Sequence, residues 1–163
     1  MYRVTFVSSF FPARAKPRDR ALSHRILQVW LDALVETNVL VMREAKERGT
    51  PLPPLYSSGV VYREEPKGVE EWLDCLEIVR RGFDDCEGLG CFRAAELRVQ
   101  GLTNARAVWK YWQNPVSLSQ TYHIVTHYAP PIGGFKFPEH AKPIGNGIYE
   151  EDPSKVLGMS GEA

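Results

Sequence analysis

The sequence lacks the features that mark a membrane protein or a nucleic-acid binder. Its 20 Lys and Arg residues balance 20 Asp and Glu residues, so the formal net charge is zero and no global field favours nucleic acid or an anionic membrane. The apolar runs are too short to span a bilayer, and residues 1–7 are not followed by the apolar core and cleavage site of a signal peptide. We therefore expect neither a nucleic-acid nor a membrane partner, and a cytoplasmic location.

Cysteine is also scarce, with only Cys75, Cys86 and Cys91 in the chain. An odd number without paired spacing argues against a disulfide framework and fits a reducing compartment. The sequence has no C-x-x-C and no H-E-x-x-H, so we expect no zinc site and no cofactor. Cys75 and Cys91 fall inside predicted helices beside apolar neighbours, which predicts that both are core residues.

The order of predicted elements indicates an α+β protein. At 163 residues the chain fits a single domain, residues 1–163. The predicted elements are a strand at 2–7, a basic loop at 12–20, a helix from Ser23 to about Arg48, an extended connection at 51–54, a strand at 60–62, helices at 69–81 and 86–100, strands at 105–109 and 122–128, a loop at 130–147 and a short strand at 149–152. Helices precede the main strands, which predicts N-terminal helices packed on an antiparallel sheet.

Cys86 is the first candidate for chemistry. Asp84 and Asp85 are good N-cap residues, so Cys86 is expected in the first turn of a helix, where free N–H groups and the helix dipole favour a thiolate. Asp84, Asp85 and Glu87 oppose this electrostatically, so a histidine partner is needed. The alternative is that Cys86 is a small buried apolar residue.

His123 is the candidate partner, because it lies on the best predicted strand. Alternation places His123, Val125 and His127 on one face of that strand, and an imidazole held there can act as a general base toward a helix terminus. The alternative is a half-buried structural histidine. His127 is nearer the strand end and is expected to be peripheral.

Asp152 is the third candidate and precedes Pro153. Its carboxylate can accept a hydrogen bond from the far nitrogen of His123 and fix the tautomer. Asp-Pro is also a turn starter, so the alternative is that Asp152 caps a short helix at 154–157. A carboxylate in such a turn can serve both purposes.

Four segments together resemble the transglutaminase-like branch of the papain-type thiol enzymes, over about residues 55–159. They are Asp85-Cys86-Glu87-Gly88-Leu89, the run from Ala94 to Gly101, Tyr122-His123-Ile124-Val125 and Glu151-Asp152-Pro153-Ser154. The resemblance implies a papain/transglutaminase-like core with a catalytic triad of Cys86, His123 and Asp152. The chain looks most like short members encoded by bacteriophages and prophages, which implies a bacterial host cytoplasm and an association with the virion.

The sequence departs from that family pattern on both sides of the cysteine. Asp84 replaces the usual glycine, and Gly88 replaces the usual acid two positions after Cys86. The oxyanion donor is also unassigned; the main-chain N–H of Cys86 and the Trp72 indole N–H are the candidates.

The function that these residues favour is cleavage or transfer at an amide bond of a protein or peptide. Cys86 would form a thioester that water or an amine resolves, giving a cysteine peptidase or amidase in the first case and an acyltransferase in the second. The alternative is an inactive scaffold or virion-assembly protein that binds other phage structural proteins through aromatic anchors. The candidate anchors are Tyr56, Trp109, Tyr111 and Trp112. A nucleic-acid binder would rest on the basic loop alone.

Overall fold

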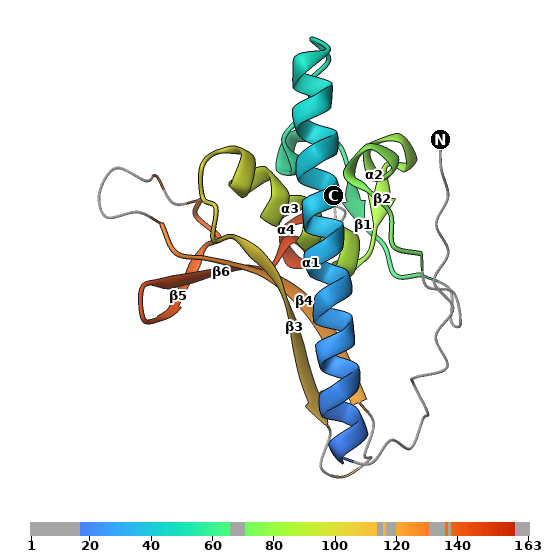
Figure 1. The fold of residues 1–163 in the computed structure, drawn as a ribbon, viewed down its shortest axis with the longest axis vertical. Helices are drawn as coiled ribbons and strands as arrows, with labels where there is room; N and C mark the ends of the chain where they lie inside the picture. The colour runs from blue at the N-terminus through green and yellow to red at the C-terminus, as the bar shows by residue number, and fades with distance from the viewer. Residues whose placement is uncertain are drawn as a thin grey trace.

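The computed structural model describes residues 17–65, 71–113, 116, 120–130, 136 and 138–158. Two long helices, α1 (Pro17–Glu47) and α3 (Cys86–Val99), pack on one face of a four-stranded antiparallel sheet (Figure 1). The sheet has the order β3-β4-β6-β5. Its strands are β3 (Arg106–Gln113), β4 (Gln120–Tyr128), β5 (Lys142–Gly145) and β6 (Ile148–Glu151). The predicted α+β class, with helices against an antiparallel sheet, is confirmed.

Smaller elements complete the fold around α3. They are the 3-10 turn η1 (Leu55–Ser57), the strands β1 (Val61–Tyr62) and β2 (Phe83–Asp84), and the helices α2 (Cys75–Arg81) and α4 (Pro153–Gly158). β1 and β2 form a separate parallel pair. In the part of the chain that is described, no helix is both long and apolar enough to cross a membrane.

Helix α1 begins earlier than predicted. The expected start at Ser23 is wrong, and residues 17–20, predicted as a loop, already belong to the helix. Proline fits the first helical position, where its missing N–H is not needed, so Pro17 starts the helix instead of preventing it. The predicted stop is confirmed, because Gly49 follows α1 with a φ of 76°. The predicted strand at 2–7 lies outside the described residues.

Helix α2 is shorter than the predicted helix at 69–81. Residues 71–74 are not helical, and α2 begins only after Asp74, whose side chain accepts hydrogen bonds from the N–H groups of Leu76 and Glu77. An N-cap of this kind satisfies the free donors of the first turn and so fixes where the helix starts. Gly82, with a φ of 80°, ends α2 as predicted.

Two strands were not predicted. β5 lies within the expected loop at 130–147, and it is exposed along its whole length at the edge of the sheet. A segment containing Pro143 and Gly145 has no strand pattern in the sequence. Proline is nevertheless tolerated on an edge strand, because the solvent side of that strand needs no N–H groups to pair with a neighbouring strand. β2 has only two residues, Phe83 and Asp84, and is defined by its pairing with β1.

Helix α3 is the centre of the core. An apolar stripe along one side was expected, but every residue from Gly88 to Leu97 is buried. One side of α3 packs closely on β4, because Gly90 has no side chain and leaves room for Ile124. The Gly90 carbonyl also accepts a hydrogen bond from Thr126 Oγ1 at 3.0 Å. A helix enclosed on all sides holds its N-terminus in a fixed place.

The β3 edge of the sheet is covered by α1. The Gln28 side chain imitates a neighbouring strand: its Nε2 donates to the Ala107 carbonyl at 2.8 Å, and its Oε1 accepts from the Trp109 N–H at 3.4 Å. A strand edge left open would invite pairing with another chain. Helix α1 therefore both packs on the sheet and closes this edge.

A buried carboxylate joins α3 to β6. Glu151 is fully buried and accepts two hydrogen bonds from Arg93, at 2.8 Å from Nε and 3.1 Å from Nη2. The hydroxyls of Tyr56 and Tyr128 each donate to it at 2.7 Å. Arg93 also binds Glu96 at 2.5 Å. Buried charges persist only when they are paired and hydrogen-bonded in this way.

Arg93→Met is expected to lower the free energy of unfolding by about 3–5 kcal/mol, because it leaves the Glu151 carboxylate buried without its countercharge. Urea unfolding followed by circular dichroism measures the loss. Arg48→Met is the matched control, because the exposed Arg48–Glu44 pair contributes less than ~1 kcal/mol. Equal losses in the two variants would contradict the structural role given to the buried pair.

Candidate active site

Cys86 is the first residue of α3, as predicted. Asp85 caps the helix, and its Oδ1 accepts a hydrogen bond from the Glu87 N–H at 3.3 Å. The thiol is partly buried against the core. The main-chain N–H of Ile124 on β4 lies close enough to favour the ionised sulfur. The start of α3 thus brings the thiol beside the strand that carries His123.

The surroundings of the Cys86 thiol favour its neutral form. The sulfur donates a hydrogen bond to Glu87 Oε2 at 3.1 Å. Burial raises the pKa of the thiol well above its usual range, and the Glu87 and Asp85 carboxylates raise that pKa further, against the opposite effect of Ile124. The expected lowering of the thiol pKa at the helix start is therefore wrong. Desolvation and neighbouring carboxylates outweigh the helix dipole here.

His123 and Asp152 meet directly, with His123 Nε2 lying 2.9 Å from Asp152 Oδ2. Asp152 also caps α4, because its Oδ1 accepts from the Lys155 N–H at 3.3 Å. Burial alone would raise the pKa of Asp152, but the hydrogen bonds from His123 and Lys155 hold that pKa at about 2. The carboxylate therefore serves both of the roles foreseen for it.

No hydrogen bond joins Cys86 to His123 among the described residues. His123 directly precedes Ile124, whose main-chain N–H favours the ionised sulfur, but the Ile124 side chain faces α3 at Gly90, and alternation along the strand turns His123 to the opposite face. The hydrogen bond of the thiol goes to Glu87 instead. The structure thus brings together His123 and Asp152 of the three predicted residues, whereas the Cys86 thiol donates its hydrogen bond to Glu87.

The other two cysteines are core residues, as expected. Cys75 and Cys91 are fully buried. Burial raises the pKa of Cys75 to about 12 and that of Cys91 well above its usual range. One correction applies: Cys75 lies at the first position of α2 and not inside a helix. A helix N-terminus alone does not make a thiol reactive when the side chain is fully desolvated.

A second histidine–carboxylate pair was not predicted. His127 Nε2 lies 2.8 Å from Glu150 Oε2, and Lys110 Nζ binds the same oxygen at 2.5 Å. Alternation could have signalled this pair, because His127 and Glu150 face each other in the β4–β6 register. A lysine binds the carboxylate in both pairs, because Lys155 Nζ lies 3.1 Å from Asp152 Oδ2, so the two histidine–carboxylate pairs have a similar electrostatic setting.

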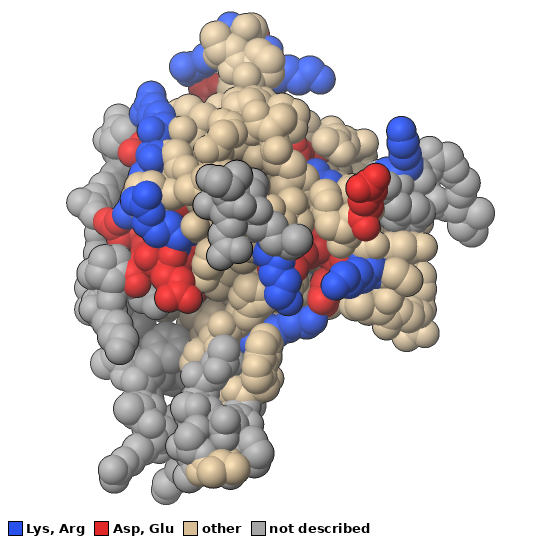
Figure 2. All heavy atoms as spheres, turned by 180° about the vertical axis from the view of Figure 1, so that it is seen from behind, with Lys and Arg blue, Asp and Glu red and all other residues tan. Residues whose placement is uncertain are grey.

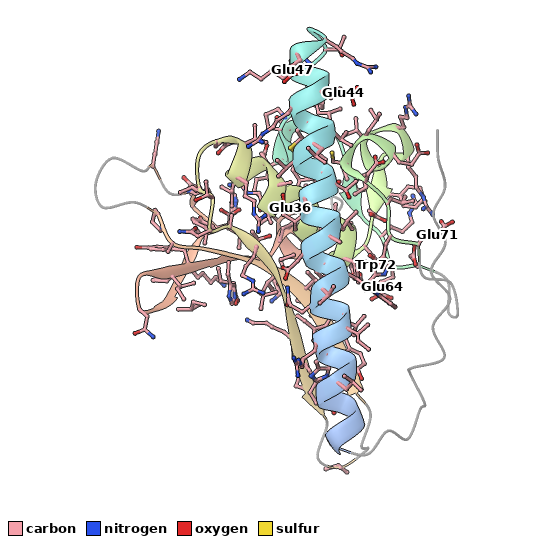
Figure 3. All side chains as sticks on the ribbon, viewed as in Figure 1. Glu36, Glu44, Glu47, Glu64, Glu71 and Trp72 are labelled. Atoms are coloured by element: carbon pink, nitrogen blue, oxygen red, sulfur yellow. The ribbon has the colours of Figure 1, made fainter. Side chains whose placement is uncertain are left out.

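The remaining candidates lie away from the thiol. The Trp72 indole, labelled in Figure 3, packs against Trp30 of α1, with ring centroids 5.8 Å apart, and no hydrogen bond joins it to Cys86 among the described residues. Tyr56 belongs to the Glu151 network, and Trp109 packs against the core, whereas Trp112 is 51% exposed. Within the described ranges no set of three side chains could hold a metal ion.

Charged side chains of both signs lie near one another on the face drawn in Figure 2. On the face seen from behind, blue and red side chains are interspersed (Figure 2). Ion pairs such as Arg81–Glu71, at 2.9 Å, account for part of this mixture. The described surface therefore adds no support for a nucleic-acid partner.

Asp84 is a functional candidate that the sequence reading passed over. The side chain is only 2% exposed, and neither carboxylate oxygen has a hydrogen-bond partner among the described residues. Burial, followed by the charge of Asp85, raises the pKa of Asp84 to about 8. Burial therefore favours the neutral form of Asp84, directly before the helix that begins with Cys86.

Comparison of the chain with family models, curated proteins and solved structures gave no match. The function is therefore argued from the geometry of Cys86, His123 and Asp152.

Asp84→Asn is expected to stabilise the protein increasingly as the pH rises. The unfolded chain releases the Asp84 proton near its ordinary pKa of 3.8, whereas the folded protein keeps it up to about pH 8. The Asp84 carboxyl therefore lowers the free energy of unfolding, and this loss grows between about pH 4 and pH 8 by at most about 1.4 kcal/mol per pH unit. Urea unfolding of both proteins between about pH 5 and 8 measures the difference. A difference that stays constant across this range would contradict the raised pKa.

Proposed function

We propose that this chain is a thiol enzyme of amide bonds, with Cys86 as nucleophile, His123 as general base and Asp152 orienting His123, in a papain/transglutaminase-like core. One observation supports the proposal: His123 Nε2 lies 2.9 Å from Asp152 Oδ2, and the main-chain N–H of the next residue on the strand, Ile124, favours the ionised form of the Cys86 thiol. Catalysis by a thiol requires an imidazole that is anchored through one nitrogen and can reach the sulfur with the other.

The proton path follows from which nitrogen of His123 is engaged. Asp152 occupies Nε2, so Nδ1 is the nitrogen that takes the thiol proton. The Cys86 side chain has to turn from Glu87 toward His123 for this transfer. The sulfur then attacks the amide carbonyl, and the C–N bond breaks as the imidazolium returns the proton to the leaving amine. The Cys86 N–H, which has no partner within the helix, is positioned to stabilise the oxyanion.

The thioester left on Cys86 is resolved by water or by an amine. Water needs no acceptor pocket, so hydrolysis is the favoured outcome, and the enzyme is then a peptidase or amidase acting on a protein or peptide. An amine acceptor makes it an acyltransferase. The setting of a phage-infected bacterial cell stays a prediction from the resemblance.

A second candidate function is a scaffold or assembly protein without catalysis. The observation that favours it is the 3.1 Å contact of the Cys86 thiol with Glu87, which stabilises the neutral sulfur. In this reading the His123–Asp152 pair is a structural cap for α4, and the thiol never becomes a nucleophile.

Activity is tested by incubating the protein with denatured casein, with and without glycine ethyl ester as an amine acceptor, and with Cys86→Ala as the control. Mass spectrometry reports cleaved peptide bonds, deamidated glutamine and amine adducts separately. The thiol-enzyme proposal predicts at least one of these products with the wild type and none with Cys86→Ala. Identical product patterns from the two proteins would favour the scaffold.

His123→Ala is expected to slow alkylation of Cys86 by iodoacetamide near pH 7, because the thiol that turns away from Glu87 then has no imidazole to take its proton. His127→Ala is the matched control and should leave the rate unchanged. Peptide mapping assigns the label to Cys86 and not to the buried Cys75 or Cys91. If the two histidine variants share one pH profile, the pairing of Cys86 with His123 is wrong.

Glu87→Gln tests whether the Glu87 carboxylate only stabilises the neutral thiol or itself takes the thiol proton. Removing the charge beside the sulfur lowers the thiol pKa, so alkylation of Cys86 at pH 7 should become about tenfold faster. Glu77→Gln is the matched control, because Glu77 lies in the first turn of α2, away from the thiol. A slower reaction in Glu87→Gln would mean that Glu87, and not His123, takes the thiol proton.

A further inference from the structure

The space beside Gly88 is already filled by the side chain of Asp84. A Cβ atom at position 88 would lie 1.7 Å from Asp84 Oδ2 and 2.8 Å from Asp84 Cγ, distances that no real contact reaches. It would also lie 2.9 Å from Ile78 Cδ1, but that is the mobile end of a flexible side chain. A side chain at position 88 would therefore displace the carboxyl of Asp84 from its present place, whereas the backbone of Gly88 itself does not call for glycine.

The main chain fixes Asp84 from the side of the small sheet. Asp84 is the last residue of β2, paired with Tyr62, and its carbonyl accepts a hydrogen bond from the Arg63 N–H at 3.0 Å. The next residue, Asp85, is the N-cap of α3. The Asp84 side chain thus lies across the junction between β2 and the first turn of the helix.

The groups around Asp84 explain why its carboxyl stays uncharged. Burial is the largest cause, and the acids Asp85 and Glu65, whose own pKa values are also raised, oppose a further charge, whereas Arg81 from α2 is the nearby cation. Inside α3 the neighbouring titratable group is the buried Cys91. The carboxyl oxygens have no hydrogen-bond partner in the described structure, so the contact with Gly88 is one of packing.

We propose that Asp84 is a positioning residue for the thiol: its carboxyl, packed on Gly88, sets the direction in which α3 leaves β2 and so fixes where the Cys86 sulfur lies. A contribution of Asp84 to catalysis rests on the proposed function. The effect of Asp84 on the position of the Cys86 sulfur does not, because the reactivity of the thiol can be measured without turnover.

A rescue experiment tests the contact. Alkylation of Cys86 at pH 7 is measured in Gly88→Ala, Asp84→Gly and the double variant. Gly88→Ala is expected to slow the reaction about tenfold, because the displaced start of α3 moves the sulfur, and a rise of about one unit in the thiol pKa lowers the thiolate fraction about tenfold. Asp84→Gly combined with Gly88→Ala should recover most of that loss, because the clash is gone.

Gly90→Ala is the matched control. It also adds a Cβ to α3, but that atom would meet Ile124 Cγ2 at 2.8 Å and not Asp84. Asp84→Gly should therefore rescue Gly88→Ala and leave Gly90→Ala unrescued. Rescue of both variants, or of neither, would overturn the proposal.

A pH profile tests the uncharged state and does not depend on whether Gly88→Ala folds. Asp84→Asn keeps the shape of the side chain but cannot ionise. Its alkylation rate should match the wild type below pH 7 and be about tenfold higher above pH 8, where the charge on Asp84 raises the thiol pKa of the wild type. Superimposed profiles would overturn the proposed role. The variants His123→Ala and His127→Ala test the proposed thiol enzyme separately. A failure of the Asp84 proposal can therefore be distinguished from a failure of the proposed function.

Discussion

The buried bond between Arg93 and Glu151 is the constraint on which the site depends. It ties the middle of α3 to the end of β6, and the residue after Glu151 is Asp152. The same carboxylate lies opposite Thr126 in the β4–β6 register, three positions from His123. One interaction therefore fixes the helix that begins with Cys86 relative to the pair that would act on it. The hydrogen bonds to Glu151 offset the large cost of burying its charge.

The thiol itself is held neutral by its surroundings. Burial, Glu87 and Asp85 stabilise the neutral sulfur, against the opposite effect of the Ile124 N–H. A substrate or a side-chain rotation that displaces Glu87 would shift this balance. In this account the resting thiol is inert, and its reactivity depends on the direction in which the sulfur points.

Part of this site could be predicted from the sequence because it depends on local rules. Capping by Asp85, alternation along β4 and the Asp152–Pro153 turn each follow from neighbouring residues. The rest depends on contacts between distant segments. The raised thiol pKa requires knowing where Glu87 points. The two departures from the family pattern looked unrelated in the sequence, but Asp84 and Gly88 occupy one shared space.

The most direct measurement of the central claim is the titration of the histidine rings by ¹⁵N nuclear magnetic resonance, in the wild type and in Cys86→Ser. The account predicts that Nε2 of His123 carries the proton donated to Asp152, and that replacing the thiol changes the titration of His123 while leaving that of His127 unchanged. Identical His123 titration curves in the two proteins would contradict it, because the imidazole would then not sense the thiol at all.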